Sequence, residues 1–124
     1  MTNDNNLKNI LSVLHTIRLT AIIEEKDIHA AIIKEFQKNN ICFQHEHKIG
    51  KGRRVDFFCN GVVIEVKKLR PQKDRLIKQI NRYLEIPGVT AVIIVLQKSI
   101  DLKKTMRDKS VYIISLNRNW GIAI

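Results

Sequence analysis

The chain has 124 residues, a hydrophobic fraction of 44% and a formal net charge of +10. This length predicts one domain, residues 1–124, with a single modest core, and no apolar run approaches the ~20 residues that a membrane helix needs. The N-terminal residues lack the basic and apolar blocks of a signal peptide, so we expect a cytoplasmic protein without a membrane partner. The two cysteines are too few for a disulfide framework and favour buried, reduced thiols.

The positive charge suggests a polyanionic partner, although basicity alone does not distinguish DNA, RNA, anionic lipid or a merely soluble surface. The cations gather on both sides of residues 55–66. Those before this segment are Lys48, Lys51, Arg53 and Arg54, and those after it are Lys67, Lys68, Arg70, Lys73, Arg75 and Lys78. The segment therefore lies in a cationic surround that suits phosphates.

Two helices are predicted first along the chain. Apolar residues three or four apart predict a helix over 5–19, which would pack on the core or on a partner chain. A second helix is predicted over 24–39, and its apolar stripe is Ile28, Ile32 and Phe36. On a wheel of about 100° per residue, Glu25 falls within about 20° of the centre of that stripe and Glu24 about 80° away. Glu25 is the better candidate to face a metal site, but both acids could instead be solvated and favoured by the helix dipole.

Residues 41–48 are predicted to form a strand. His45 and His47 would point to the same side of this strand and could bind a transition metal. A solvated, polar strand face explains the same pair without a metal. Glu46 would lie on the opposite side.

Residues 53–68 contain two alternating runs around Asn60-Gly61, which is a strong signal for a two-residue hairpin turn. This turn would set Asp56 opposite Glu65. One predicted face carries the apolar residues Val55, Phe57, Cys59, Val62, Ile64 and Val66. The other carries Arg54, Asp56, Phe58, Val63, Glu65 and Lys67. Opposed carboxylates roughly 5 Å apart repel each other, so a divalent cation is an obvious means of holding them.

A third helix is predicted over 73–85, ended by Pro87-Gly88. Its apolar face would be Leu76, Ile77, Ile80 and Leu84. Gln79 and Tyr83 are four residues apart and would be neighbours on one side of this helix. Residues 89–96 are almost continuously apolar, which predicts a strand buried on both faces in a crossover unit beside the hairpin. We expect a loop or short helix over 99–107, a strand over 111–116 and a short edge strand over 120–124.

These residues resemble a known family. Asp56 followed by Glu65-Val66-Lys67 resembles the PD-(D/E)XK nuclease motif, with Glu25 in the place of the first-helix acid and Val55 in the place of the motif's proline. Gln79 and Tyr83 resemble the Gln-x-x-x-Tyr element of RecB-like members. The resemblance covers roughly residues 24–97. It implies an α/β fold with a restriction-endonuclease-like αβββαβ core, a mixed central sheet flanked by helices, an N-terminal helical extension (1–20) and C-terminal strands (98–124).

The resemblance also implies metal-dependent hydrolysis of DNA phosphodiesters, with RNA not excluded. Mg²⁺ or Mn²⁺ would be held by Asp56, Glu65, the Val66 carbonyl and Glu25, and Lys67 would orient or deprotonate the attacking water. Gln79 and Tyr83 would support the site. The expected nucleic-acid contacts are Lys51, Arg53, Arg54, Lys68, Arg70 and Lys73.

Two functions remain open from the sequence. One is an active nuclease, and the other is a basic module that binds DNA or RNA without cutting it. Within the nuclease class, similarity to junction resolvases would imply branched DNA and a homodimer that uses the N-terminal helix. The Gln-x-x-x-Tyr element would instead imply the processing of DNA ends.

Overall fold

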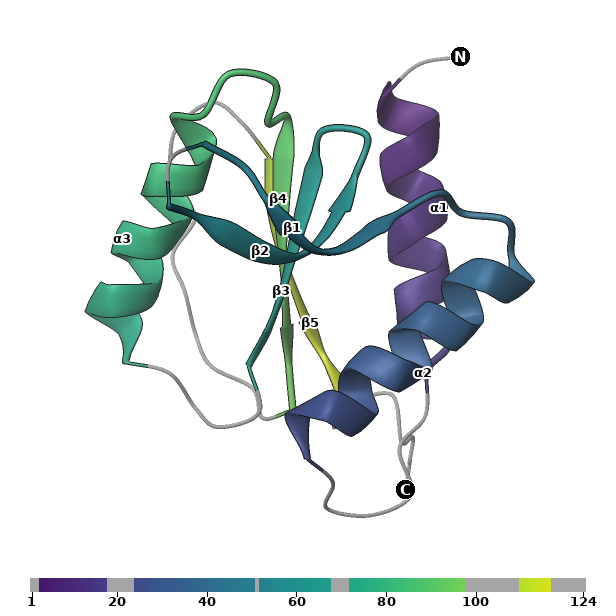
Figure 1. Cartoon of the computed structure of the whole chain (residues 1–124). Helices are drawn as coiled ribbons and strands as arrows, with labels where there is room; N and C mark the ends of the chain where they lie inside the picture. Colours follow the sequence, from purple (N-terminus) through teal and green to yellow (C-terminus); the bar gives the residue numbers. More distant parts are fainter. Residues whose placement is uncertain (1–2, 18–23, 51, 68–71, 98–109, 117–124) are drawn as a thin grey trace.

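The computed structural model describes residues 3–17, 24–50, 52–67, 72–97 and 110–116 (Figure 1). The elements in chain order are α1 (Asn3–His15), α2 (Glu25–Lys38), β1 (Gln44–Lys48), β2 (Arg54–Cys59), β3 (Val62–Lys67), α3 (Lys73–Leu84), β4 (Ala91–Leu96) and β5 (Ser110–Ser115). The helices and strands predicted within these residues are all present, with ends shifted by a few residues. The predictions for 99–107 and 120–124 lie outside the described residues.

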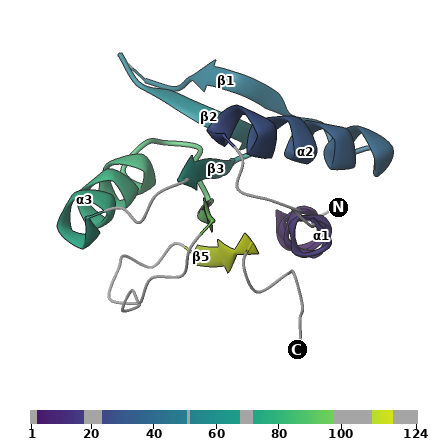
Figure 2. The same cartoon turned by 90° about the horizontal axis from the view of Figure 1, so that it is seen from below.

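The strands form one mixed sheet in the order β1-β2-β3-β4-β5. β1, β2 and β3 pair antiparallel, whereas β3, β4 and β5 pair parallel. α3 connects the parallel neighbours β3 and β4, which confirms the predicted crossover unit. Helices α1 and α2 cover one face of the sheet and α3 covers the other (Figures 1 and 2). The α/β class and the mixed, helix-flanked sheet are therefore confirmed.

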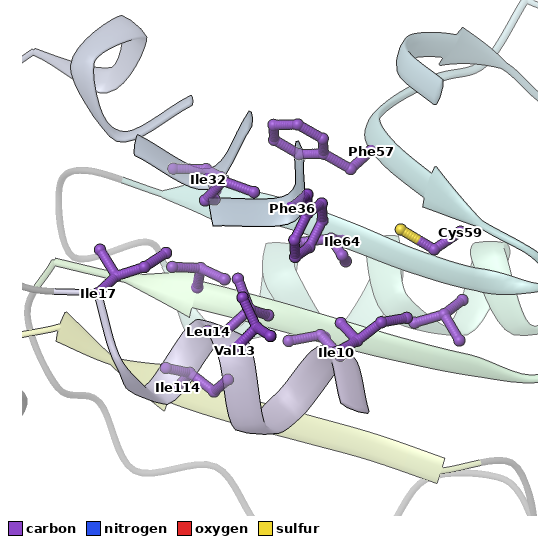
Figure 3. Packing of buried hydrophobic residues seen from close by; sticks show 14 of the residues in the cluster. Ile10, Val13, Leu14, Ile17, Ile32, Phe36, Phe57, Cys59, Ile64 and Ile114 are labelled. Atoms are coloured by element: carbon purple, nitrogen blue, oxygen red, sulfur yellow. The ribbon is translucent and has the colours of Figure 1, made fainter. Parts of the chain in front are cut away.

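Two hydrophobic clusters hold these layers together. The larger lies between the sheet and helices α1 and α2, and includes Leu14, Phe36, Phe57 and Ile64 (Figure 3). The smaller lies under α3, where Ile80 packs with residues of β3 and β4. Every residue of β4 is buried, as predicted for a strand buried on both faces. Burial of each large apolar side chain contributes roughly 1.5–3 kcal/mol, so the two clusters stabilise the sheet on which the polar residues of β2 and β3 are placed.

The hairpin turn at Asn60-Gly61 is confirmed. Both residues have positive φ angles (48° and 93°), as a type I′ turn requires. A Cβ atom at Gly61 would lie 3.0 Å from Thr90 Oγ1 and 3.1 Å from the Gly88 carbonyl oxygen. Glycine therefore meets both the backbone angle and the close approach of the next loop. The predicted pairs Phe57–Ile64 and Cys59–Val62 follow from this turn.

The predicted alternation fails at one level of the sheet, between Phe57 and Val55. Phe57 packs on the α1–α2 side, but Val55 packs in the cluster under α3, so its expected face was wrong. Backbone pairing of β2 with β3 stops at Phe57–Ile64, so β3 does not hold Val55 in phase with Phe57. The neighbouring strand changes face at the same level, because Glu46 in β1 has a φ of 52°.

The two histidines of β1 consequently separate. The ring of His45 lies 4.8 Å from that of Phe57, on the α2 side. The ring of His47 instead stacks on Phe58 at 5.4 Å, and Phe58 packs on the α3 side. The prediction that both histidines share one side was wrong, because the left-handed backbone at Glu46 interrupts the two-residue period of the strand.

Two smaller findings concern the burial of side chains. Tyr83 is buried on α3 and Ile77 is only half-buried, so the apolar face of this helix is rotated toward the tyrosine. Both cysteines are free thiols, as expected, but Cys42 is exposed, and only Cys59 is buried, where burial raises its pKa to about 12.

None of the helices in the described ranges is long and apolar enough to cross a membrane.

Candidate functional site

Asp56 and Glu65 meet where β2 and β3 part. The backbone N–H of Asp56 donates a hydrogen bond to Glu65 Oε2 (3.2 Å), and the backbone N–H of Val66 donates one to Asp56 Oδ2 (2.8 Å). Each carboxylate is thus held by the backbone of the opposite strand. These two bonds replace the backbone pairing that ends one residue earlier, and they fix the facing acids that the hairpin predicted.

Gln79 and Tyr83 reach this point from α3. The Tyr83 hydroxyl donates to Glu65 Oε2 (3.0 Å), and Gln79 Nε2 donates to the Tyr83 hydroxyl oxygen (3.0 Å). Burial and the Glu65 charge hold the pKa of Tyr83 above its ordinary value, so the phenol stays neutral and remains a donor. Lys67 Nζ lies 3.9 Å from Glu65 Oε1. We call the set Asp56, Glu65, Lys67, Gln79 and Tyr83 the carboxylate site.

The two acids of the carboxylate site have opposite electrostatics. Glu65 is only 5% exposed, and burial together with the Asp56 charge raises its pKa to about 7, against the opposing effects of Lys67 and Tyr83. Burial also acts to raise the pKa of Asp56, but the nearby His29 imidazole, the hydrogen bond from the Val66 N–H and the charge of Lys67 outweigh it and lower that pKa. At neutral pH Asp56 is therefore ionised, whereas Glu65 is partly protonated.

His29, and not Glu25, is the α2 residue that faces Asp56. His29 Nε2 lies 3.6 Å from Asp56 Oδ2, and the Asp56 carboxylate raises the pKa of this imidazole. Glu25 is the exposed first residue of α2, although its charge also acts on His29. The helical wheel identified the side of α2 that faces the site, but it does not show the position along the helix axis. Glu25 lies one turn before His29, the residue that faces Asp56. His29 was detectable from the sequence as the histidine next to Ile28 on the buried stripe, one turn after Glu25. A catalytic or metal role for Glu25 stays a prediction.

The structure describes three of the six residues that are expected to contact nucleic acid. Lys51, Lys68 and Arg70 lie outside the described residues, and Arg54 and Lys73 are exposed. Arg53 is half-buried, and its Nη1 donates to the backbone carbonyl of Arg82 (3.2 Å). This bond links the start of β2 to the end of α3.

A groove of about 620 Å³ opens beside the carboxylate site along α3. Its lining is Lys67, Gln72, Arg75, Leu76, Lys78, Gln79 and Arg82. Four of these residues are cationic, and none is acidic or aromatic. The groove shares Lys67 and Gln79 with the carboxylate site, so a ligand in it would touch both. We call it the basic groove.

The donor atoms of the carboxylate site fit a hard divalent cation. Mg²⁺ and Mn²⁺ prefer oxygen ligands, and Asp56 and Glu65 supply carboxylates from adjacent strands. Burial and the Asp56 charge raise the pKa of Glu65 more than Lys67 lowers it. A cation would oppose this rise and favour the ionised form of Glu65. The Val66 N–H is bound to Asp56, and a ligand role for the Val66 carbonyl stays a prediction.

Comparison of the chain with protein-family models, with curated proteins and with solved structures gives no match.

Proposed function

We propose that this chain is a metal-dependent nuclease of the PD-(D/E)XK type with a restriction-endonuclease-like core. The observation that carries the proposal is the convergence of Asp56, Glu65 and Lys67 where β2 and β3 part. The element order α2-β1-β2-β3-α3-β4 agrees with the αβββαβ core of that fold. Contact of Tyr83 with Glu65 supports the RecB-like variant, because it joins the Gln-x-x-x-Tyr element directly to an acid of the motif.

Each residue has a distinct part in this proposal. Asp56 and Glu65 hold Mg²⁺ or Mn²⁺, which when bound polarises a phosphate and lowers the pKa of a bound water. The Lys67 ammonium orients the attacking water and offsets negative charge that develops on the phosphate. Tyr83 holds the Glu65 carboxylate in place, and Gln79 holds the Tyr83 hydroxyl.

The basic groove supports a polynucleotide substrate. Its four cations suit consecutive phosphates, and its lining within the described ranges has no aromatic side chain on which bases could stack. Binding led by backbone phosphates is independent of sequence. DNA is the substrate we propose, with cleavage that follows the structure of the nucleic acid and not its sequence.

A cleavage assay tests this function. Supercoiled, linear, single-stranded and branched DNA are each incubated with the protein and Mg²⁺ or Mn²⁺. We expect metal-dependent cleavage of at least one substrate, loss of that cleavage in Glu65→Ala, and retention of it in Glu35→Gln, which alters an acid on α2 outside the site. Absence of cleavage in every case, or cleavage unchanged by Glu65→Ala, would contradict the proposal.

A binding module without catalysis is the second candidate, favoured by a basic groove whose cations need no metal. This function predicts salt-sensitive binding of DNA or RNA that persists in EDTA, and no stabilisation by Mn²⁺. A rise in Tm with Mn²⁺ that disappears in Asp56→Ala would count against it.

A further inference from the structure

A second group of metal-ligating atoms lies at the edge of the sheet, on the side of α2. Ligating atoms of His29, His45 and Glu46 all lie within 4.8 Å of one another. They come from α2 and from β1, which are separate in sequence. We propose that these three residues, the edge cluster, bind a transition-metal dication such as Zn²⁺ through His29 Nδ1, His45 Nε2 and the Glu46 carboxylate. This inference goes beyond the nuclease proposal, since no step of hydrolysis assigned above uses these three side chains.

The two imidazoles are hydrogen-bonded to each other, and a metal ion would replace that bond. His29 Nδ1 lies 2.8 Å from His45 Nε2. Around a tetrahedral ion with nitrogen ligands at 2.0–2.1 Å, the two nitrogens would be about 3.3 Å apart. The rings therefore need to separate by only about 0.5 Å. His45 is exposed, so its ring has room to make this movement.

The surroundings of His29 select the nitrogen that would bind the metal. His29 Nε2 faces Asp56 Oδ2 at 3.6 Å, and a carboxylate in that position favours the proton on Nε2. In the neutral imidazole, which is the form that binds a metal, Nδ1 then carries the lone pair and directs it toward His45. A histidine whose other ring nitrogen faces a carboxylate is a common arrangement in metal sites, because it fixes the tautomer and the ring orientation. His29 is also 9% exposed and packs against Phe57 at a ring distance of 5.2 Å, so it is held in this orientation.

The backbone of β1 brings the third ligand to the same side. Adjacent residues in a strand normally point to opposite faces, so His45 and Glu46 could not both face α2 in a regular strand. The φ of 52° at Glu46 breaks that rule and places its carboxylate within reach of both imidazoles. Two imidazole nitrogens and one carboxylate oxygen suit Zn²⁺, Co²⁺ or Ni²⁺ better than Mg²⁺. Three protein ligands leave the fourth position of a tetrahedral ion to water.

A metal at the edge cluster would act as a clamp. It would join α2 to β1, the strand at one edge of the described sheet. Because Asp56 faces both His29 and the carboxylate site, the clamp would also fix the ring that lies beside that acid.

Calorimetric titration tests Zn²⁺ binding to the edge cluster directly. The full chain is stripped with EDTA, exchanged into chelator-free buffer and titrated with ZnCl₂ in the absence of nucleic acid. We expect one Zn²⁺ per chain and a rise in Tm with Zn²⁺. His45→Gln and Glu46→Gln should each weaken binding by at least about tenfold. His47→Gln is the matched control, since its ring stacks on Phe58 away from the cluster, and it should bind Zn²⁺ as the unaltered chain does.

Two results would overturn the inference. The first is equal Zn²⁺ affinity in His45→Gln and the unaltered chain, and the second is an equal loss in His47→Gln. ¹⁵N NMR of the imidazoles removes any dependence on the folding of variants: Zn²⁺ should shift the ring nitrogens of His29 and His45, and shifts confined to His15 and His47 would also overturn it. Because no nucleic acid and no Mg²⁺ are present, failure here leaves the nuclease proposal standing.

Discussion

The two sides of Asp56 differ in donor chemistry and in exposure. On the α3 side, Glu65 and Tyr83 are buried and the donors are oxygens. On the α2 side, His45 and Glu46 are exposed and two of the three metal-ligating atoms are nitrogens. One carboxylate thus borders a setting suited to a hard cation and another suited to a softer one. The two proposed metal sites therefore differ in ligand type, although they lie within a few residues of each other on β1 and β2.

The same division explains why the two acids carry different charge. His29 faces Asp56 and lowers the pKa of that acid. Glu65 is more deeply buried than Asp56, and burial together with the Asp56 charge raises its pKa. The separation of pKa values within a carboxylate pair is a frequent property of hydrolytic sites. The following variants test whether the α2 side and the α3 side of Asp56 differ in metal binding and in charge.

The largest effect is expected at Lys67. Lys67→Met removes the ammonium 3.9 Å from Glu65 Oε1, and kcat for DNA cleavage should fall by about 10²–10³ because developing charge is no longer offset. Zn²⁺ binding should be unchanged. Lys78→Met, in the basic groove, is the control and should reduce the salt dependence of DNA binding by a slope of about 1 without a comparable loss of kcat. Comparable loss of kcat in both variants would mean that Lys67 only binds phosphate.

The next effect concerns pH. The folded-state pKa of Glu65 is about 7 against an ordinary 4.5, so the folded chain binds the proton more tightly than the unfolded chain does. The resulting stabilisation is fully present below about pH 4.5 and is lost as pH rises through about 7. Urea unfolding of the metal-free chain should show a fall on the order of 3 kcal/mol over this range.

The variant Glu65→Gln should remove most of that fall, and Glu35→Gln should keep it. His29, whose pKa Asp56 raises, adds a smaller loss of stability in the same direction above pH 6.5. Mn²⁺ should flatten the profile by favouring ionised Glu65. A profile that rises between pH 5 and 7 in the metal-free chain would refute the charge assignment.

Asp56→Asn should affect both sides at once. The variant removes the carboxylate that faces His29 and that lies beside Glu65. We expect a loss of about tenfold in Zn²⁺ affinity, as for a residue that orients a metal ligand, and loss of the Tm rise caused by Mn²⁺. Asp74→Asn, in the exposed first turn of α3, should change neither measurement. If Asp56→Asn altered only one metal, the two sides would be independent.

The smallest effect is expected at Glu46. Glu46→Gly suits a φ of 52° better than glutamate does, so stability without metal should rise by up to about 1 kcal/mol in urea unfolding. The same change removes a proposed Zn²⁺ ligand. Glu46→Gln keeps the backbone strain and removes the charge, and it should lose Zn²⁺ affinity without this gain in stability. A loss of stability in Glu46→Gly would show that the left-handed backbone is not a source of strain.

The sequence was most informative where the signals are local. Asn60-Gly61 specified the turn, and the turn specified the pairing of Phe57 with Ile64. The spacing of Gln79 and Tyr83 placed them on one side of α3, and the structure then brings both to Glu65. In each case the relevant geometry depends on residues close together in the chain, so a fixed period was enough to predict it.

The errors arose where long-range packing decided the outcome. The separation of His45 from His47 depends on one backbone angle at Glu46, which no alternation pattern reveals. The contact of His29 with Asp56 was missed because it depends on how α2 is placed along the sheet, and a helical wheel contains no such information. The edge cluster was missed for the same reason, since it requires α2 and β1 to be placed against each other.

The left-handed residue Glu46 in β1 bears on strand pairing at this edge of the described sheet. An open strand at the edge of a sheet offers unpaired N–H and C=O groups to any other chain. β1 carries Lys48, Glu46 and two histidines in only five residues, and the left-handed backbone at Glu46 interrupts its row of hydrogen-bonding groups. A foreign strand would therefore find no continuous template along this edge, even though the sheet behind it is strongly apolar.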